Sequence, residues 1–156
     1  MMRRKDREIG EFSKMIEILK ACDCCRLGLV DGDEAYIVPM NFGYDIIDEQ
    51  LVLYFHCAKE GRKMDLLPEQ RVVAFEMDTK HKLIAGEIGC DFSFMYQCIM
   101  GTGVLYAVTD EDEKIRGLQR IMNHYAETKN WEFKSEYVDK VQVLKLNVEA
   151  WSCKEH

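Results

Sequence analysis

The sequence predicts a mainly β protein with flanking helices, built on a small six-stranded antiparallel barrel. Segments such as 25–30, 51–56 and 141–148 alternate between two faces with the period of two that strands require. Asp31-Gly32-Asp33 is typical of a hairpin turn, because glycine accepts the positive φ that such turns need. The regular alternation of helix and strand that builds parallel sheets is missing, which favours an antiparallel barrel.

The composition indicates one globular domain over residues 1–156. The chain is 47% apolar and 31% charged, and its length allows one core of ordinary size. The 28 acidic and 21 basic residues give a formal charge of −7, which disfavours nucleic acid and other polyanions as partners. No apolar run has membrane-spanning length, and the start MMRRKDREIGEF lacks the apolar core of a signal peptide. We therefore expect a cytoplasmic protein without a membrane segment.

The seven cysteines indicate a reducing compartment, since an odd number leaves one unpaired in any disulfide scheme. Cys22 and Cys25 have C-x-x-C spacing, with Cys24 between them. A structural zinc site normally needs four ligands, and no second pair stands at metal spacing. The sequence therefore predicts small buried thiols, with the zinc site or redox pair that uses C-x-x-C spacing as the alternative.

Two longer helices are predicted on the outside of the barrel. Residues 7–21 carry apolar side chains at helical spacing with charged residues between them. The second helix is capped by Thr109 or Asp110, has acidic residues in its first turn and continues to Tyr125.

The remaining strands are predicted from alternation and from glycine and proline. Residues 35–42 form the returning strand of the first hairpin, and Pro39 within it belongs at a sheet edge or a bulge. Residues 43–50 are expected to be a loop. The fourth strand covers 71–77, and a long loop over 78–91 is expected to border a site.

Residues 92–108 are too long for one flat strand. Gly101 and Gly103 are expected to mark a bend where this strand passes from one side of the barrel to the other.

The stretch from Leu51 to Pro68 carries the strongest functional signal. A strand turns into a short helix that Pro68 ends, and Gly61 lets the backbone approach a ligand closely. The turn and the first helical positions carry three basic residues: Lys59, Arg62 and Lys63. Helix-start N–H groups together with an arginine and a lysine suit a phosphate. The alternative is a solvated basic turn without a ligand.

The order of these motifs resembles the FMN-binding split-barrel family. It looks most like the pyridoxamine 5'-phosphate oxidase-like branch that contains the nitroimidazole-resistance flavoproteins. The resemblance covers about residues 8–150, and its most specific parts are YIVPMNFGY at 36–44 and FHCAKEGRK at 55–63.

The resemblance implies a homodimer of split barrels with one FMN at each of two equivalent interface sites. Apolar residues on both faces of strands such as 51–55 also favour a homodimer, in a barrel too small to bury all of them. By position, the resemblance places cofactor-binding roles on several residues: a phosphate pair at Arg62 and Lys63 within the basic turn that also holds Lys59, flavin neighbours at His56 and Cys57, ring contacts at Met40, Asn41 and Phe42, and, within one residue, a ring glutamine at Gln97.

The resemblance implies an FMN-dependent oxidoreductase that reduces a small oxidant such as a nitroaromatic compound, with a nicotinamide cofactor or another electron donor. His56 is the candidate catalytic residue, as a hydrogen-bond or proton donor, with a structural role as the alternative. Two further functions stay open: a non-catalytic flavin- or haem-binding protein, and a pyridoxamine phosphate oxidase-like oxidase. The arginine-rich, tryptophan-containing C-terminal segment of true pyridoxamine phosphate oxidases is not evident in VEAWSCKEH.

Overall fold

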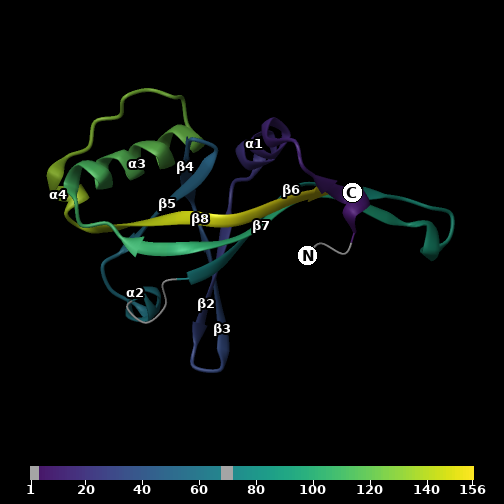
Figure 1. Cartoon of the computed structure of the whole chain (residues 1–156), viewed down its shortest axis with the longest axis horizontal. Coiled ribbons are helices and arrows are strands. Elements are labelled where there is room, and N and C mark those ends of the chain that lie inside the picture. The colour runs from purple at the N-terminus through teal and green to yellow at the C-terminus, as the bar shows by residue number, and fades with distance from the viewer. Residues whose placement is uncertain (1–3, 68–71) are drawn as a thin grey trace.

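The computed structural model describes residues 4–67 and 72–156, and its centre is one antiparallel sheet (Figure 1). The strand order is β3-β2-β6-β7-β8-β5-β4, and β3 runs directly into β4 at Asn41, so the sheet curls into a split barrel. The predicted antiparallel split barrel is confirmed, with eight strands in place of six. The strands are β1 Glu8–Ile9, β2 Cys25–Asp31, β3 Glu34–Met40, β4 Phe42–Ile47, β5 Gln50–Ala58, β6 Val72–Ile84, β7 Ser93–Ala107 and β8 Val141–Glu155.

Within the described residues, four α-helices accompany the barrel: α1 Phe12–Ala21, α2 Arg62–Leu66, α3 Glu111–Tyr125 and α4 Ser135–Val138. The predicted first helix is too long, because Lys5–Arg7 form a 3-10 turn and β1 pairs with β8. The predicted α3 is confirmed, and the Asp110 carboxylate caps it by accepting a hydrogen bond from the Glu113 N–H at 2.9 Å. The predicted end of α2 at Pro68 lies outside the described residues.

Most of the core fills the barrel interior, and a smaller part lies under α3. The interior is built from side chains of every long strand and of α1: Ile18, Leu19, Leu27, Phe42, Leu53, Phe55, Phe75, Met77, Ile99, Leu144 and Leu146. On β5 the alternate residues Val52 and Tyr54 face outward and pack with Ile121 of α3. Helix α3 thus covers the second apolar face of β5. The argument that this face requires a second subunit is therefore wrong.

The loop predicted over 43–50 is wrong, because most of it is strand β4. Gly43 and Asp45 resemble loop residues, but both lie beneath α3, where the helix backbone approaches Gly43 closely. The buried Asp45 carboxylate pairs with two arginines of α3, Arg116 at 2.8 Å and Arg120. A two-residue turn at 48–49, with φ of 50° and 64°, then leads into β5. Asp48-Glu49 is a weak sequence signal for a two-residue turn in which both residues have positive φ, because such turns favour Asn-Gly.

Gly43→Ala is expected to destabilise the fold. A Cβ at Gly43 would meet the backbone of Arg120 and Ile121, which cannot move without shifting α3. We expect the free energy of unfolding to fall by about 2 kcal/mol in urea denaturation. Gly10→Ala is the matched control, because a Cβ at Gly10 meets no atom within 4 Å. Equal stability of the two variants would contradict the packing described here.

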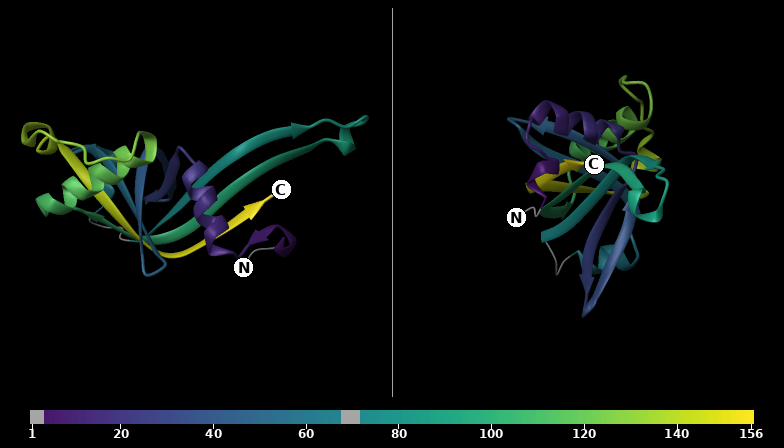
Figure 2. Two further views of the ribbon diagram at one scale, coloured as in Figure 1. Left: turned by 90° about the horizontal axis from the view of Figure 1, so that it is seen from above. Right: turned by 90° about the vertical axis from the view of Figure 1, so that its right-hand side faces the viewer.

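Strands β6 and β7 continue past the barrel as a two-stranded arm (Figure 1 and Figure 2). The loop predicted over 78–91 is wrong as far as Ile84, since the ladder continues to the pair Ile84 and Ser93. The bend predicted at Gly101 and Gly103 stays a prediction; the pairing of β7 with β8 shifts register between Thr102 and Gly103, where β8 carries the extra residue Glu149. Gly103 is required there, because a Cβ would strike the Asn147 carbonyl oxygen. The last predicted strand also extends further, to Glu155.

Candidate functional site

The basic turn lies where β5 ends and α2 begins. Gly61 adopts a φ of +116°, which favours glycine. The Arg62 guanidinium donates to Asp31 Oδ2 at 2.6 Å, lies 3.5 Å from Glu34 Oε2 and stacks 4.6 Å above the Tyr36 ring. The hydrogen bond to Asp31 raises the pKa of Arg62. Arg62 is therefore directed towards the β2–β3 hairpin, and a phosphate would have to share it with Asp31.

The two lysines of the turn have no ion-pair partner among the described residues. Lys59 is exposed and Lys63 is half-buried beside the Cys57 thiol. Cys57 Sγ lies 3.8 Å from Met64 Sδ, and burial raises the pKa of the thiol, against a smaller opposing effect of the Lys63 charge. Lys63 is thus the better-placed cation for a phosphate, and Cys57 is a protonated packing residue.

The residues around the β3–β4 junction divide between core and surface. Phe42 is fully buried, its ring centroid lies 4.3 Å from that of His124, and its N–H donates to the Tyr125 hydroxyl at 3.2 Å. Met40 is also buried, and Asn41 between them is exposed. The role predicted for Met40 and Phe42 beside a bound ring stays a prediction; because both side chains belong to the barrel interior, it rests on their backbone groups. Asn41 is left as the accessible side chain.

His56 and Gln97 lie apart from each other in the chain. His56 is exposed near the end of β5, opposite Val143 of β8. Gln97 donates to Glu155 Oε2 at 2.9 Å, and Lys14 of α1 pairs with the other oxygen of that carboxylate at 2.5 Å.

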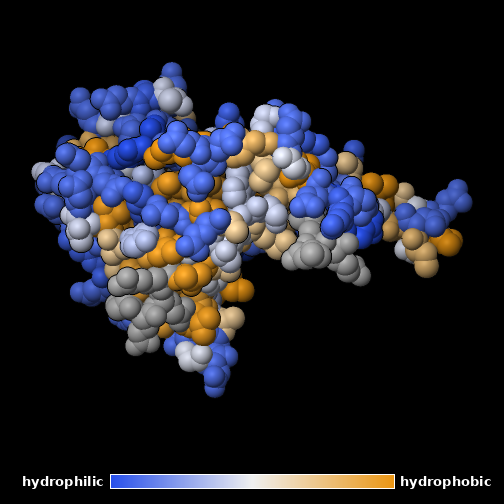
Figure 3. Space-filling view, viewed as in Figure 1, coloured by the Kyte–Doolittle hydropathy of each residue, from blue (hydrophilic) through white to orange (hydrophobic). Residues whose placement is uncertain are grey.

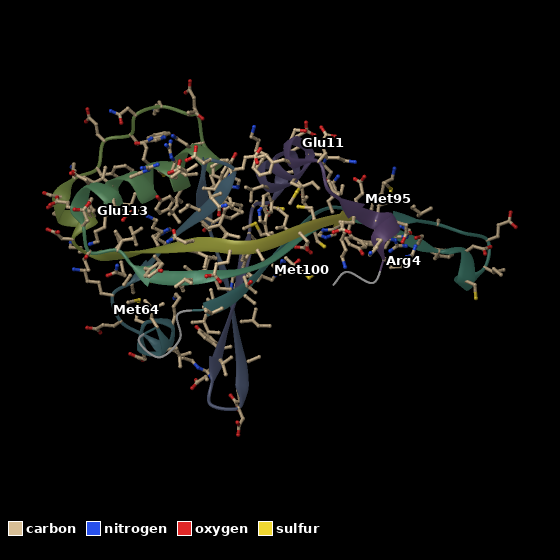
Figure 4. The ribbon with its side chains drawn as sticks, in the orientation of Figure 1. Arg4, Glu11, Met64, Met95, Met100 and Glu113 are labelled. Carbon is tan, nitrogen blue, oxygen red and sulfur yellow. The ribbon has the colours of Figure 1, made fainter. Side chains whose placement is uncertain are left out.

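Figure 4 shows the distance between the two halves of the predicted site. Met64 on α2 lies at the lower left of the view, and Met95, two residues before Gln97 on β7, lies well to its right near the start of the arm. One copy of the chain therefore does not bring Gln97 to the basic turn. The carbonyl oxygen Oε1 of Gln97 is buried and has no hydrogen-bond partner among the residues that the structure describes.

A groove of about 720 Å³ lies on the outer face of the sheet, across β2, β3, β6, β7 and β8. Figure 3 shows apolar side chains gathered over this part of the sheet. Its floor consists of small residues that face outward on neighbouring strands: Gly28, Ala74, Thr102, Ala150 and Ser152. Ile37 at one side is 64% exposed and Met100 at the other is 42% exposed. This volume suits a drug-sized ligand or the side chains of a partner.

Charged side chains at one end of the groove are paired within the chain. Arg26 donates to Glu76 Oε2 at 2.9 Å and to Asp78 Oδ1 at 2.6 Å, and both hydrogen bonds raise the pKa of Arg26. The groove therefore presents an apolar floor, with an ion-paired cluster at one end that keeps an excess negative charge. The sequence alone does not predict the groove, because Gly28 and Ala74 carry no local signal and become neighbours only when β2 pairs with β6.

The predicted buried thiols are present at Cys22 and Cys25. Burial raises the pKa of Cys22 and of Cys153 to about 12, so both stay protonated. Within residues 4–67 and 72–156, no three His, Cys, Asp or Glu side chains are grouped closely enough to hold a metal ion. The helices of the described residues include none that is long and apolar enough to cross a membrane.

The chain matches the family model for pyridoxamine 5'-phosphate oxidase over residues 13–155. The chain belongs to this family. No curated protein matches it.

Solved structures of the pyridoxamine 5'-phosphate oxidase-like type agree with the family. A protein from Bacteroides thetaiotaomicron, provisionally described as a 5-nitroimidazole antibiotic resistance protein, is 30% identical, with a TM-score of 0.81 over 95% of this chain and 86% of that one. The flavocytochrome Anf3 from Azotobacter vinelandii is 17% identical, with a TM-score of 0.83 over 100% of this chain and 72% of that one. The FAD- and haem-binding protein from Mycobacterium smegmatis is 16% identical, with a TM-score of 0.81 over 95% and 72%. The last two show the shared fold.

The residues present fit a flavin phosphate in part. Lys59 and Lys63 offer unpaired positive charge beside a glycine that leaves the backbone accessible, and Arg62 can join them once it is released from Asp31. The Arg62 side and the groove side are opposite faces of the same edge strand, because Tyr36 and Ile37 are consecutive residues of β3. A planar ring at the β3 edge would therefore have the basic turn on one side and the groove on the other.

Proposed function

We propose that this protein binds FMN at the edge of β3 and acts as an oxidoreductase on a small oxidant such as a nitroaromatic compound. The observation that carries the proposal is the helix-free apolar groove next to a turn with unpaired lysines. The 30% identity to the Bacteroides protein supports the same class of function.

We propose further that a second copy of the chain covers the groove and completes the site. Helices α1 and α3 pack elsewhere on the barrel, so the groove face stays apolar and exposed in one copy. Two such faces brought together would exclude water from the β3 edge, as an isologous interface requires.

The bound flavin would supply the electron transfer to the oxidant. The chain's own residues then have binding and orienting roles. Lys59, Lys63 and Arg62 hold the phosphate, and the exposed Asn41 side chain offers polar groups to the ring edge. His56 is exposed and is the candidate donor of a proton or hydrogen bond to the reduced product.

The proposal predicts that purified protein carries FMN. Oxidised protein should be yellow and should release FMN, and not FAD, on denaturation, as chromatography of the supernatant would measure. Turnover with a nicotinamide donor and a nitroimidazole then separates an oxidoreductase from a flavin carrier or a haem-binding protein. Protein that stays colourless after incubation with excess FMN would falsify the cofactor assignment.

A further inference from the structure

We propose a second ligand site, for a small molecule bearing a phosphate or carboxylate group, in the pocket between α1, β4 and α3. The pocket has a volume of about 600 Å³. It is lined by side chains of these three elements and of the chain that follows α3: Lys20, Tyr44, Asp45, Arg120, Asn123 and Thr128. None of these residues contributes to the groove or to the basic turn.

The single carboxylate of the pocket is already neutralised. Asp45 is 8% exposed, and its two oxygens face Arg116 and Arg120 from the overlying helix. Two guanidinium groups share one carboxylate, so this cluster keeps an excess positive charge. The Nε atom of Arg120 is buried against Asp45 Oδ1 without making a hydrogen bond, and the terminal N–H groups of Arg120 also have no hydrogen-bond partner among the described residues. The N–H groups of Arg120 are therefore available to a bidentate oxyanion.

Asn123 is held in one orientation by its neighbours. Its Oδ1 accepts hydrogen bonds from Gln119 Nε2 at 3.0 Å and from Trp131 Nε1 at 3.1 Å, and it lies 3.4 Å from the Lys129 N–H. Because the amide oxygen is committed to these donors, the amide NH₂ group is the part left to face the pocket. Asn123 is therefore a fixed donor.

Lys20 and Tyr44 add further donors to the pocket. Lys20 is exposed and has no ion-pair partner among residues 4–67 and 72–156. Burial raises the pKa of Tyr44, so its hydroxyl remains protonated and able to donate. His124 also lines the pocket, and because its Nε2 donates to the Cys22 carbonyl oxygen at 2.7 Å, its Nδ1 is a further acceptor. The donors still outnumber the acceptors, so the pocket favours an anion although the whole chain carries a net charge of −7. The volume leaves room for a small organic body behind the oxyanion.

The test titrates inorganic phosphate, and separately acetate, into FMN-saturated protein and follows the backbone amide of residue 123 by NMR, a signal that every variant retains. Asn123→Asp keeps the acceptor oxygen and replaces the donor NH₂ by a second oxygen. It should weaken binding at least tenfold, and Lys20→Glu should do the same. Lys82→Glu on the arm makes the same charge change far from the pocket and should leave the affinity unchanged. Whichever anion binds more tightly identifies the ligand class as phosphate or carboxylate.

Two results would overturn the site. One is the absence of any saturable shift with either anion at tens of millimolar. The other is phosphate binding that Asn123→Asp and Lys20→Glu leave unchanged and Arg62→Ala removes, since that binding would belong to the basic turn. Both readouts are independent of flavin turnover.

Discussion

Arg62→Ala is expected to lower the affinity for FMN by about tenfold to a hundredfold, because it removes charge-assisted hydrogen bonds to the phosphate. Riboflavin, which has the same ring and no phosphate, should lose little. Fluorescence titration of the apoprotein with both flavins measures the difference. Arg62→Lys should recover part of the loss, since an ammonium keeps the charge without the fork of donors.

The ion pair between Arg62 and Asp31 provides a second variant that tests the same role of Arg62. Arg62 donates to Asp31 at 2.6 Å in the structure, so the carboxylate and a phosphate compete for one guanidinium. Asp31→Asn should therefore leave FMN binding unchanged or tighten it, while Arg62→Ala weakens it. If both variants lower the affinities for FMN and for riboflavin equally, the Arg62–Asp31 ion pair joins the hairpin to α2 and Arg62 does not bind the phosphate.

Ala74→Arg is expected to convert a homodimer into a monomer and to abolish FMN binding with it. Ala74 lies on the floor of the groove between Gly28 and Thr102. An unpaired charge buried in an interface costs about 3 kcal/mol or more, which raises the dimer Kd by at least about a hundredfold. Light scattering should then give the 18.3 kDa of one chain in place of twice that mass.

Ile47→Arg is the matched control for the groove. Ile47 is also an exposed apolar strand residue, at the end of β4, and it does not line the groove. This variant should remain dimeric and yellow. A monomeric wild-type protein that still holds FMN would show that one chain completes the site, and a dimer unaffected by Ala74→Arg would place the interface elsewhere.

The sequence by itself determined the elements that depend on local physics. Alternation predicted β2 and β5, Asp31-Gly32-Asp33 predicted the hairpin, and Asp110 with its acidic neighbours predicted α3. These signals survive because side-chain period, positive φ and the helix dipole act over a few residues.

The tertiary structure decided where residues with weak local signals belong. Gly43 and Asp45 are residue types typical of loops, but in the structure both lie in strand β4 beneath α3. The missing Cβ of Gly43 lets α3 approach, and the two arginines of α3 pair with Asp45. In the same way, Phe42 has the sequence position of a ring contact but the burial of a core residue.

The groove and the pocket between α1, β4 and α3 could not be predicted from the sequence for a related reason. Gly28 and Ala74 lie 46 positions apart and meet only through the pairing of β2 with β6. Asn123 becomes a fixed donor only because Gln119 and Trp131 occupy its oxygen. Local patterns determine which segments are strands and helices, and the pairing of distant segments determines which surfaces they form, because burial and charge balance depend on neighbours that are remote in the chain.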